Sequence, residues 1–224
     1  MGVRAISFDA DQTLWDFRSV QQRALDTTAR TMIDRGLVPA GSVDATRLQS
    51  ARDEIVADVQ TQPHNLEEVR RASFALVLER AGCMDVDARA DELLAGFLDV
   101  RFGEIELYPE VRGCLDRLRA QHRLGLLSNG NSYPDRCGLG GVFDAVVFGP
   151  SHGFAKPDPR AFATIAAQLG VEATHMMHVG DDWDDVHGAN AAGMVSVYLN
   201  REGADPPFRQ HAAVEIGNLE ELEL

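Results

Sequence analysis

A short apolar run near the start of the chain ends abruptly in two acids. The run Val3–Phe8 is mostly apolar, and Asp9 and Asp11 follow it with one residue between them. Such a run is typical of a strand that is buried on both faces of a parallel sheet. Because side chains along a strand alternate with a period of two, the two carboxylates should point the same way and perturb each other's pKa values. A cation or a chemical role is therefore expected there, with an Asp-rich turn as the plainer alternative.

Further apolar runs alternate with segments of helical character. The runs typical of strands are Arg123–Ser128, Ala145–Phe148, Met176–Val179 and Val195–Leu199. Helices are expected over residues 108–121, 157–169 and 185–192, and a loop-rich tail from Arg201. Strands that alternate with helices favour a parallel sheet. The sequence therefore predicts an α/β fold, with a Rossmann-like parallel sheet that carries helices on both faces.

A long helical block interrupts this alternation. Between Phe17 and Glu104, apolar residues recur at steps of three and four, and glycines such as Gly36 and Gly82 mark helix ends. The block carries no strand pattern. We therefore expect residues 17–104 to form an inserted all-helical domain, and residues 1–16 and 105–224 to form the Rossmann-like core together.

The composition narrows the classes of partner. The 224 residues carry a net charge of −14, which argues against a nucleic-acid polymer or an anionic membrane as a partner but leaves room for one small phosphate. Apolar stretches fall short of the ~20 residues that a membrane-spanning helix needs. Because a core strand begins almost at once, we expect no signal peptide. Three widely spaced cysteines predict reduced thiols and a cytoplasmic location: Cys83, Cys114 and Cys137.

Polar side chains gather where the expected strands end. Ligands of open α/β sheets bind at the carboxyl ends of the strands, where the direction of winding reverses. This coincidence predicts a functional site at that edge of the sheet. Its members are Asp9, Asp11 and Thr13 after the first strand, Ser128 and Asn129 at the end of 123–128, Lys156 after 145–148, and Asp181, Asp182 and Asp185 after 176–179.

Each cluster also has a plainer structural explanation. The Ser-Asn-Gly sequence that starts at Ser128 could cradle a phosphate through its hydroxyl and backbone N–H groups, or form an ordinary turn. Lys156 could neutralise a phosphoryl group or lie in solvent. Four acids between Asp181 and Asp185 exceed what helix capping needs, and oxygen-only ligands select a hard cation, of which Mg²⁺ fits best. The neighbouring histidines lack a matched spacing and are expected to be structural: His175, His178 and His187.

Together the clusters resemble the four motifs of the haloacid dehalogenase-like hydrolase superfamily. They occur in the family's order and cover the whole chain, with the helical block in the place of a cap inserted after the first strand. Any single motif is weak, whereas the ordered set is specific. The resemblance implies a hydrolase with a Rossmann-like core and a helical cap domain. The motifs are strand–Asp9-x-Asp11-x-Thr13, strand–Ser128-Asn129, Lys156-Pro157, and Gly180-Asp181-Asp182-x-x-Asp185.

The resemblance also implies roles for the catalytic residues. Asp9 would be the nucleophile that forms an aspartyl-phosphate. Asp11 would protonate the leaving group and then activate water, and its backbone carbonyl would bind Mg²⁺. Lys156 would orient Asp9 and screen charge.

The remaining motif residues would bind metal and substrate. Asp181 would bind Mg²⁺ together with Asp9, and Asp185 would bind it directly or through water, or hold Lys156. Asp182 is a further candidate metal ligand, because the stretch satisfies more than one variant of the acidic motif. The residues that would hydrogen-bond the phosphoryl oxygens are Thr13, Ser128 and, through its backbone, Asn129.

Asp11 bears on the choice between two reactions. The dehalogenases of the family resemble one another in lacking the second acid of the first motif, and they need no metal. Asp11 and the acid-rich fourth motif therefore favour a Mg²⁺-dependent phosphomonoester hydrolase. Its substrate would be a small soluble metabolite, such as a nucleoside monophosphate or a sugar or glycolate phosphate. A 2-haloacid dehalogenase and a non-catalytic binding protein on the same fold are the alternatives.

Overall fold

The computed structural model describes residues 2–58 and 65–222, so residues 59–64 of the predicted helical domain lie outside it. The chain forms two compact units. The sheet unit consists of Met1–Asp16 and Glu106–Leu224, and the helical unit is Phe17–Ile105. Among the described residues, no helix is both long enough and apolar enough to cross a membrane.

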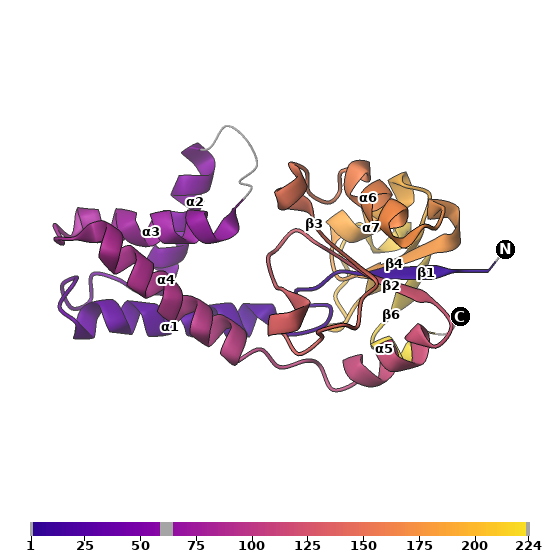
Figure 1. Ribbon diagram of the computed structural model, residues 1–224, viewed down its shortest axis with the longest axis horizontal. Helices are drawn as coiled ribbons and strands as arrows, with labels where there is room; N and C mark the ends of the chain where they lie inside the picture. The colour runs from indigo at the N-terminus through magenta and orange to yellow at the C-terminus, as the bar shows by residue number, and fades with distance from the viewer. Residues whose placement is uncertain (1, 59–64, 223–224) are drawn as a thin grey trace. The chain divides into compact units, whose positions relative to one another are not determined.

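The sheet unit is built on a sheet of six parallel strands (Figure 1). The strands lie side by side in the order β3-β2-β1-β4-β5-β6. Because β1 lies between β2 and β4, the winding reverses beside it, which is where ligands of such sheets bind. The predicted α/β fold with a Rossmann-like parallel sheet is confirmed. The strands are β1 Ala5–Phe8, β2 Arg123–Ser128, β3 Ala145–Phe148, β4 Met176–Gly180, β5 Val195–Leu199 and β6 Val214–Ile216.

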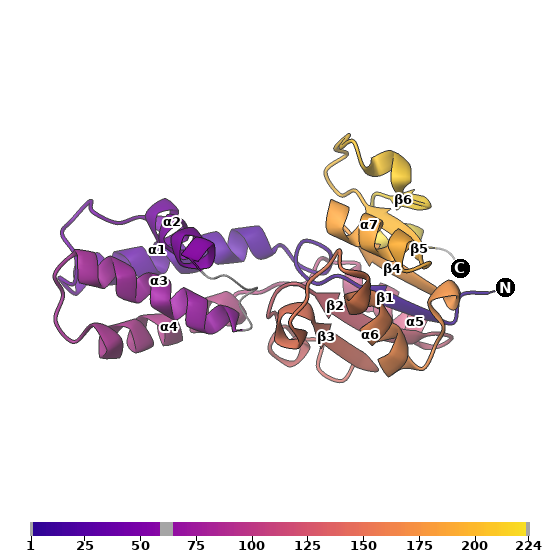
Figure 2. The ribbon, with the colours of Figure 1, turned by 90° about the horizontal axis from the view of Figure 1, so that it is seen from above.

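Helices cover both faces of the sheet. α5 (Val111–Arg119) packs against β2 on one face, whereas α6 (Pro159–Leu169) and α7 (Trp183–Ala191) cover the other (Figures 1 and 2). The face under α6 is a buried apolar core that includes Phe162. α7 lies so close to α6 that a Cβ at Gly188 would be 2.1 Å from the Phe162 ring. This close packing fixes α7, and the acids at its start, over the end of β4.

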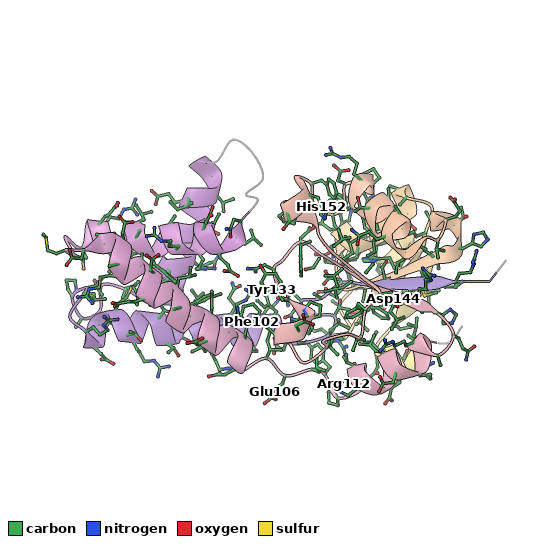
Figure 3. All side chains as sticks on the ribbon, viewed as in Figure 1. Phe102, Glu106, Arg112, Tyr133, Asp144 and His152 are labelled. Carbon is green, nitrogen blue, oxygen red and sulfur yellow. The ribbon has the colours of Figure 1, made fainter. Side chains whose placement is uncertain are left out.

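Two side chains fix β2 and the loop that follows it (Figure 3). Asp144, just before β3, accepts a hydrogen bond from the backbone N–H of Leu124 at 2.9 Å. Tyr133, in the loop after β2, packs its ring edge-on against Phe148 of β3, with the centroids 5.3 Å apart. The loop segment around Ser132 is thereby held against the sheet.

The described part of the helical unit contains only helices as regular elements. Their apolar faces enclose a core of their own, in which Phe74 and Phe97 meet edge-on with ring centroids 5.7 Å apart. Asn65 caps the third helix by accepting a hydrogen bond from the N–H of Glu67 at 3.0 Å. The helices are α1 Phe17–Asp34, α2 Ala45–Asp58, α3 Leu66–Arg80 and α4 Val86–Gly103.

Several element bounds differ from the predicted ones, most of them at helix ends. α6 begins at Pro159, two residues after its predicted start, because Asp158 caps it by accepting a hydrogen bond from the N–H of Arg160 at 2.9 Å. α5 begins at Val111, so Pro109 lies before the helix and not in its first turn.

α7 begins at Trp183, two residues before its predicted start, because Asp182 and Asp185 form a reciprocal capping box. The tail was expected to be loop-rich, yet it contributes β6. This edge strand has only three residues, two of them exposed, so it leaves no apolar run in the sequence.

Candidate active site

The carboxyl ends of β1, β2 and β4 carry the predicted site residues. Asp9 directly follows β1, and its backbone N–H donates to the carbonyl of Val179 in β4 at 2.8 Å. Ser128 is the last residue of β2, and Asp181 follows the last residue of β4. Lys156 comes from the segment between β3 and α6 and lies against the end of β1. All of these residues belong to the sheet unit.

The ammonium group of Lys156 bridges two carboxylates. Its Nζ donates to Oδ1 of Asp9 and, at 2.5 Å, to Oδ1 of Asp185. All three side chains are at least nine-tenths buried. Because one positive charge faces two negative ones, a surplus of negative charge remains inside the protein, which is unfavourable unless something further neutralises it.

Burial and charge shift the pKa values of these groups in different directions. Burial alone would raise the pKa of Asp185, but Lys156 and a hydrogen bond from His178 hold it well below the usual range. Burial also opposes the charged form of Lys156, yet Asp185 and Asp9 raise its pKa above the usual value. Burial raises the pKa of Asp9, and repulsion from Asp185 and Asp181 adds to the effect. A further cation would therefore favour the ionised form of Asp9.

Asp185 has a second buried partner, His178, which the sequence indicated only as structural. Nε2 of His178 lies 2.9 Å from Oδ1 of Asp185, and Nδ1 of the same ring lies 2.8 Å from Oγ of Ser7. Burial lowers the pKa of His178, so the ring is neutral at neutral pH. The alternation of side chains along a strand could have indicated that both residues point toward the site. Ser7 lies two positions before Asp9, and His178 lies two positions before Gly180, so each shares a face of its strand with that residue.

Asp11 is held by two neutral donors. Nε1 of Trp15 donates to Oδ1 of Asp11 at 2.8 Å, and the hydroxyl of Ser132 donates to the same oxygen at 2.7 Å. Oδ2 faces Gly130, where a Cβ would lie 2.6 Å away. Both of these donors act on Oδ1, and neither acts on Oδ2. Neither Trp15 nor Ser132 is among the predicted site residues, because a single indole or hydroxyl beside a motif forms no pattern.

Thr13 and the acids after β4 are linked to one another. The Thr13 hydroxyl donates to Oδ1 of Asp181 at 3.3 Å. Burial, followed by repulsion from Asp185, raises the pKa of Asp181 to about 6 and that of Asp182 to about 7. The Asp182 side chain accepts a hydrogen bond from the N–H of Asp185 at 3.2 Å, and the N–H of Asp182 donates to Oδ2 of Asp185 at 3.3 Å. Asp182 therefore acts as the N-cap of α7.

The two predicted phosphate-binding residues at the end of β2, Ser128 and Asn129, have partners within the protein. Oγ of Ser128 accepts a hydrogen bond from the N–H of Gly130 at 2.9 Å. The Asn129 amide donates to the carbonyl of Lys156 at 2.9 Å and accepts from its N–H at 2.7 Å. The side chain of Asn129 thus fixes the backbone of Lys156.

Three carboxylates are close enough to share one cation. One oxygen each from Asp9, Asp181 and Asp185 lies within 4.8 Å of the others. Carboxylate oxygens suit a hard divalent ion such as Mg²⁺, and such an ion would offset the surplus negative charge around Lys156. The donor set and the charge of the site therefore both fit Mg²⁺.

Known proteins resemble this chain along nearly its whole length. Glyceraldehyde 3-phosphate phosphatase from Methanopyrus kandleri is 28% identical to it, over 89% of this chain and 84% of that protein. Phosphoglycolate phosphatase from Pseudomonas putida is 32% identical, over 88% of this chain and 69% of that protein. A solved structure described as a 2-haloacid dehalogenase from Pseudomonas syringae pv. Tomato DC3000 matches with a TM-score of 0.85 at 29% identity, over 98% of this chain and 96% of that one.

The sequence model of one family spans the site. The model of the haloacid dehalogenase-like hydrolases matches residues 3–193, which include every strand-end residue described above. The two relatives named here as phosphatases and the solved structure agree with this match. The chain belongs to the haloacid dehalogenase-like hydrolase family.

Proposed function

We propose that the protein is a Mg²⁺-dependent phosphomonoester hydrolase that forms an aspartyl-phosphate on Asp9. The observation that carries this proposal is that Asp9 and Asp11 have different hydrogen-bond partners: a cation for Asp9 and neutral donors for Asp11. Asp9 is buried against Lys156, whereas the neutral side chains of Trp15 and Ser132 hold Asp11 through its Oδ1. Phosphoryl transfer to a carboxylate needs an ionised nucleophile and a distinct acid–base group. The two relatives that are named as phosphatases support the same class of reaction.

The residues of this chain would act in two steps. In the first step, an oxygen of Asp9 attacks phosphorus, the bond to the leaving oxygen breaks, and Asp11 gives that oxygen its proton. In the second step, Asp11 takes a proton from water, whose oxygen attacks phosphorus while the bond to Asp9 breaks and inorganic phosphate leaves. Lys156 holds Asp9 in place, and the hydroxyls of Thr13 and Ser128 hold the phosphoryl oxygens. Catalysis then rests mainly on positioning and electrostatics.

Asp9 and Asp181 are our proposed direct ligands for Mg²⁺, with the backbone carbonyl of Asp11. When bound, the ion would supply positive charge to the phosphoryl oxygens and to the attacking carboxylate. Both oxygens of Asp185 already accept hydrogen bonds from the protein, which favours a contact through water there. Asp182 is the weaker candidate, because it caps α7.

We further propose that residues 1–16 and 105–224 are the catalytic core and that residues 17–104 serve as a cap domain that selects the leaving group. The two phosphatases above are named for glyceraldehyde 3-phosphate and phosphoglycolate, both small phosphate esters. We therefore propose a small phosphorylated metabolite of this kind as the substrate, which would suit a cytoplasmic enzyme.

A second reaction is favoured by one observation. The solved structure with a TM-score of 0.85 is described as a 2-haloacid dehalogenase. In that reaction the carboxylate of Asp9 would displace halide from carbon, and neither Asp11 nor a metal would be needed. The acid held at position 11 and the carboxylate cluster weigh against it.

Phosphate release from a panel of esters tests the proposal. The panel contains phosphoglycolate, glyceraldehyde 3-phosphate, a nucleoside monophosphate and an aryl phosphate, each with Mg²⁺ and with EDTA. We expect release that requires Mg²⁺ and that disappears in a folded Asp9→Asn variant. Halide release from a 2-haloacid, without phosphate release from any ester, would overturn the proposal in favour of the dehalogenase.

A further inference from the structure

A chain of hydrogen bonds runs from the nucleophile into the interior of the sheet unit. Asp9 accepts from Lys156, and Lys156 also donates to Asp185 at 2.5 Å. Asp185 lies 2.9 Å from Nε2 of His178, and Nδ1 of His178 lies 2.8 Å from the hydroxyl of Ser7. All five residues are more than nine-tenths buried. The mechanism above uses only the first three of them.

The direction of these hydrogen bonds follows from their chemistry. The ionised carboxylate of Asp185 can only accept, so Nε2 of His178 must carry a proton and donate it. With Nε2 protonated in the neutral ring, Nδ1 accepts from the Ser7 hydroxyl. The opposite tautomer would place two acceptors 2.9 Å apart. Asp185 therefore selects the tautomer. The Ser7 hydroxyl suits that tautomer, because it lies 2.8 Å from Nδ1 and 3.4 Å from its other acceptor, the carbonyl of Met177.

His178 completes the set of donors around Asp185. Oδ1 of Asp185 accepts from Lys156 and His178, and Oδ2 accepts from the backbone N–H of Asp182 at 3.3 Å. A carboxylate held at both oxygens cannot turn without breaking one of these bonds. Because Lys156 bridges Asp185 and Asp9, any rotation of Asp185 would shift the ammonium group away from the nucleophile.

Strand pairing and core packing hold Ser7 and His178 in place. Ser7 and His178 are directly paired in the register of β1 and β4, two central strands of the sheet. The His178 ring packs edge-on against Phe162 of α6, with the centroids 5.0 Å apart. A side chain that is fixed by sheet pairing and core packing is well suited to hold a neighbouring site in place.

We propose that His178 is a positioning residue for the reaction of Asp9. It fixes the Asp185 carboxylate through Nε2, and through Asp185 it fixes the ammonium group of Lys156 on the nucleophile, while the Ser7 hydroxyl satisfies Nδ1 of its ring. This inference rests on the proposed function and deepens it, because it assigns a role that the family's four motifs do not include.

Two matched substitutions test the position of the donor. In His178→Gln, the amide nitrogen takes about the place of Nε2 and can still donate to Asp185. In His178→Asn, the amide reaches only about as far as Nδ1. Both replacements are neutral, polar amides. We expect His178→Asn to lower kcat about tenfold or more and to leave KM for the ester unchanged. We expect His178→Gln to keep most of the wild-type kcat. His152→Asn, on an exposed histidine of the sheet unit, is the control and should match wild type.

A readout that does not depend on turnover is available, because Lys156 is the only lysine in the chain. Protein labelled with ¹⁵N-lysine should give a single Nζ signal that reports this ammonium group alone. We expect the signal of His178→Gln to resemble that of wild type, and the signal of His178→Asn to shift and exchange faster with solvent. If neither variant folds, the imidazole ¹⁵N spectrum of the wild type decides, and a proton on Nδ1 alone would overturn the inference.

The outcomes separate this inference from the proposed function. If wild type releases no phosphate from any ester, the proposed function fails, and the lysine signals alone judge the positioning role. If wild type is active and the two variants have equal kcat and equal lysine signals, the positioning role is overturned and the function stands. The positioning role would also be overturned if, in both variants, the loss of kcat were proportional to the fall in melting temperature.

Discussion

A Cβ on Gly180 would lie 2.1 Å from Cγ of Asp185, so the absence of a side chain at 180 is what gives the Asp185 carboxyl group its place. Gly180 is the last residue of β4, and Asp185 lies in the first turn of α7. The backbone of Gly180 does not adopt a positive φ, so the requirement for glycine is one of space and not of backbone conformation.

Replacing Gly180 by alanine should therefore displace Asp185 and release Lys156 from its position. We expect Gly180→Ala to lower kcat about 10- to 100-fold, as changes beside catalytic ligands typically do. Gly113→Ala is the matched control, because Gly113 lies on the exposed side of α5 and a Cβ there would meet nothing within 4 Å. The control should keep full activity and gain up to about 1 kcal/mol of stability. Wild-type turnover in Gly180→Ala would show that Asp185 need not occupy this place.

The hydrogen bonds to Asp11 predict that the loss of activity on removing one of them depends on the leaving group of the ester. Ser132→Ala removes one of the two donors to Oδ1, so the acid should be less well oriented toward the leaving oxygen. We expect kcat/KM for an alkyl phosphate to fall about tenfold, the worth of one hydrogen bond to a charged group. An aryl phosphate should lose much less, because its leaving group needs little protonation. Equal losses for both esters would argue that Ser132 supports the fold and not the acid. Ser151→Ala, on an exposed serine, is the control.

The ion pairs of Lys156 predict a loss of stability that depends on pH. Lys156 holds the pKa of Asp185 below its unfolded value of about 3.9, so the ionised pair stabilises the protein above that pH and less as the pH falls through it. Lys156→Met leaves Asp9 and Asp185 buried without their cation, and near neutral pH it should lower the free energy of unfolding by about 3–5 kcal/mol. The deficit should shrink toward about pH 4, where the acids accept protons.

Urea denaturation in EDTA at several pH values measures this deficit. Lys156→Arg is the companion variant, because it keeps the charge but not the compact ammonium group that contacts both carboxylates. We expect it to recover part of the stability and none of the turnover. A deficit for Lys156→Met that is the same at every pH would contradict the electrostatic explanation.

The acids after β4 predict that Mg²⁺ stabilises the protein more at higher pH. Their pKa values are raised to about 6 for Asp181 and about 7 for Asp182. Their contribution to stability is therefore present below the unfolded value of about 3.9 and is lost as the pH rises through 6 to 7 without metal. Because Mg²⁺ binds the deprotonated carboxylates, its stabilising effect should grow over the same range.

Melting temperatures with Mg²⁺ and with EDTA, measured from about pH 5 to about pH 8, test this prediction. The difference between the two should be small at the acid end and should increase with pH. Asp181→Asn should abolish it throughout. Asp116→Asn, which removes the same charge from the exposed side of α5, should leave it intact. A difference that stays constant with pH would mean that these acids do not bind the ion.

The strand ends of the site could be predicted because each carries a local signal. The runs at 123–128, 145–148 and 195–199 match β2, β3 and β5 residue for residue, since strands buried on both faces are continuously apolar. β6 could not be predicted in this way, because an edge strand with two exposed residues of three leaves no such run. Likewise, the early start of α7 depends on the capping box between Asp182 and Asp185, and the acids alone do not distinguish a cap from a metal ligand.

The sequence by itself determined the parallel α/β fold, the helical insertion and the acids and lysine at the strand ends, because apolar periodicity and motif spacing are local properties of the chain. Only the tertiary structure decided which side chains hold those acids. Ser7 meets His178 across 171 residues of sequence, because β1 pairs with β4 and not only with β2. Ser132 meets Asp11 across 121 residues in the same way. Contacts of this kind depend on the order of the strands in the sheet and on the space that glycines leave. Neither the strand order nor that space can be predicted from a local stretch of the sequence.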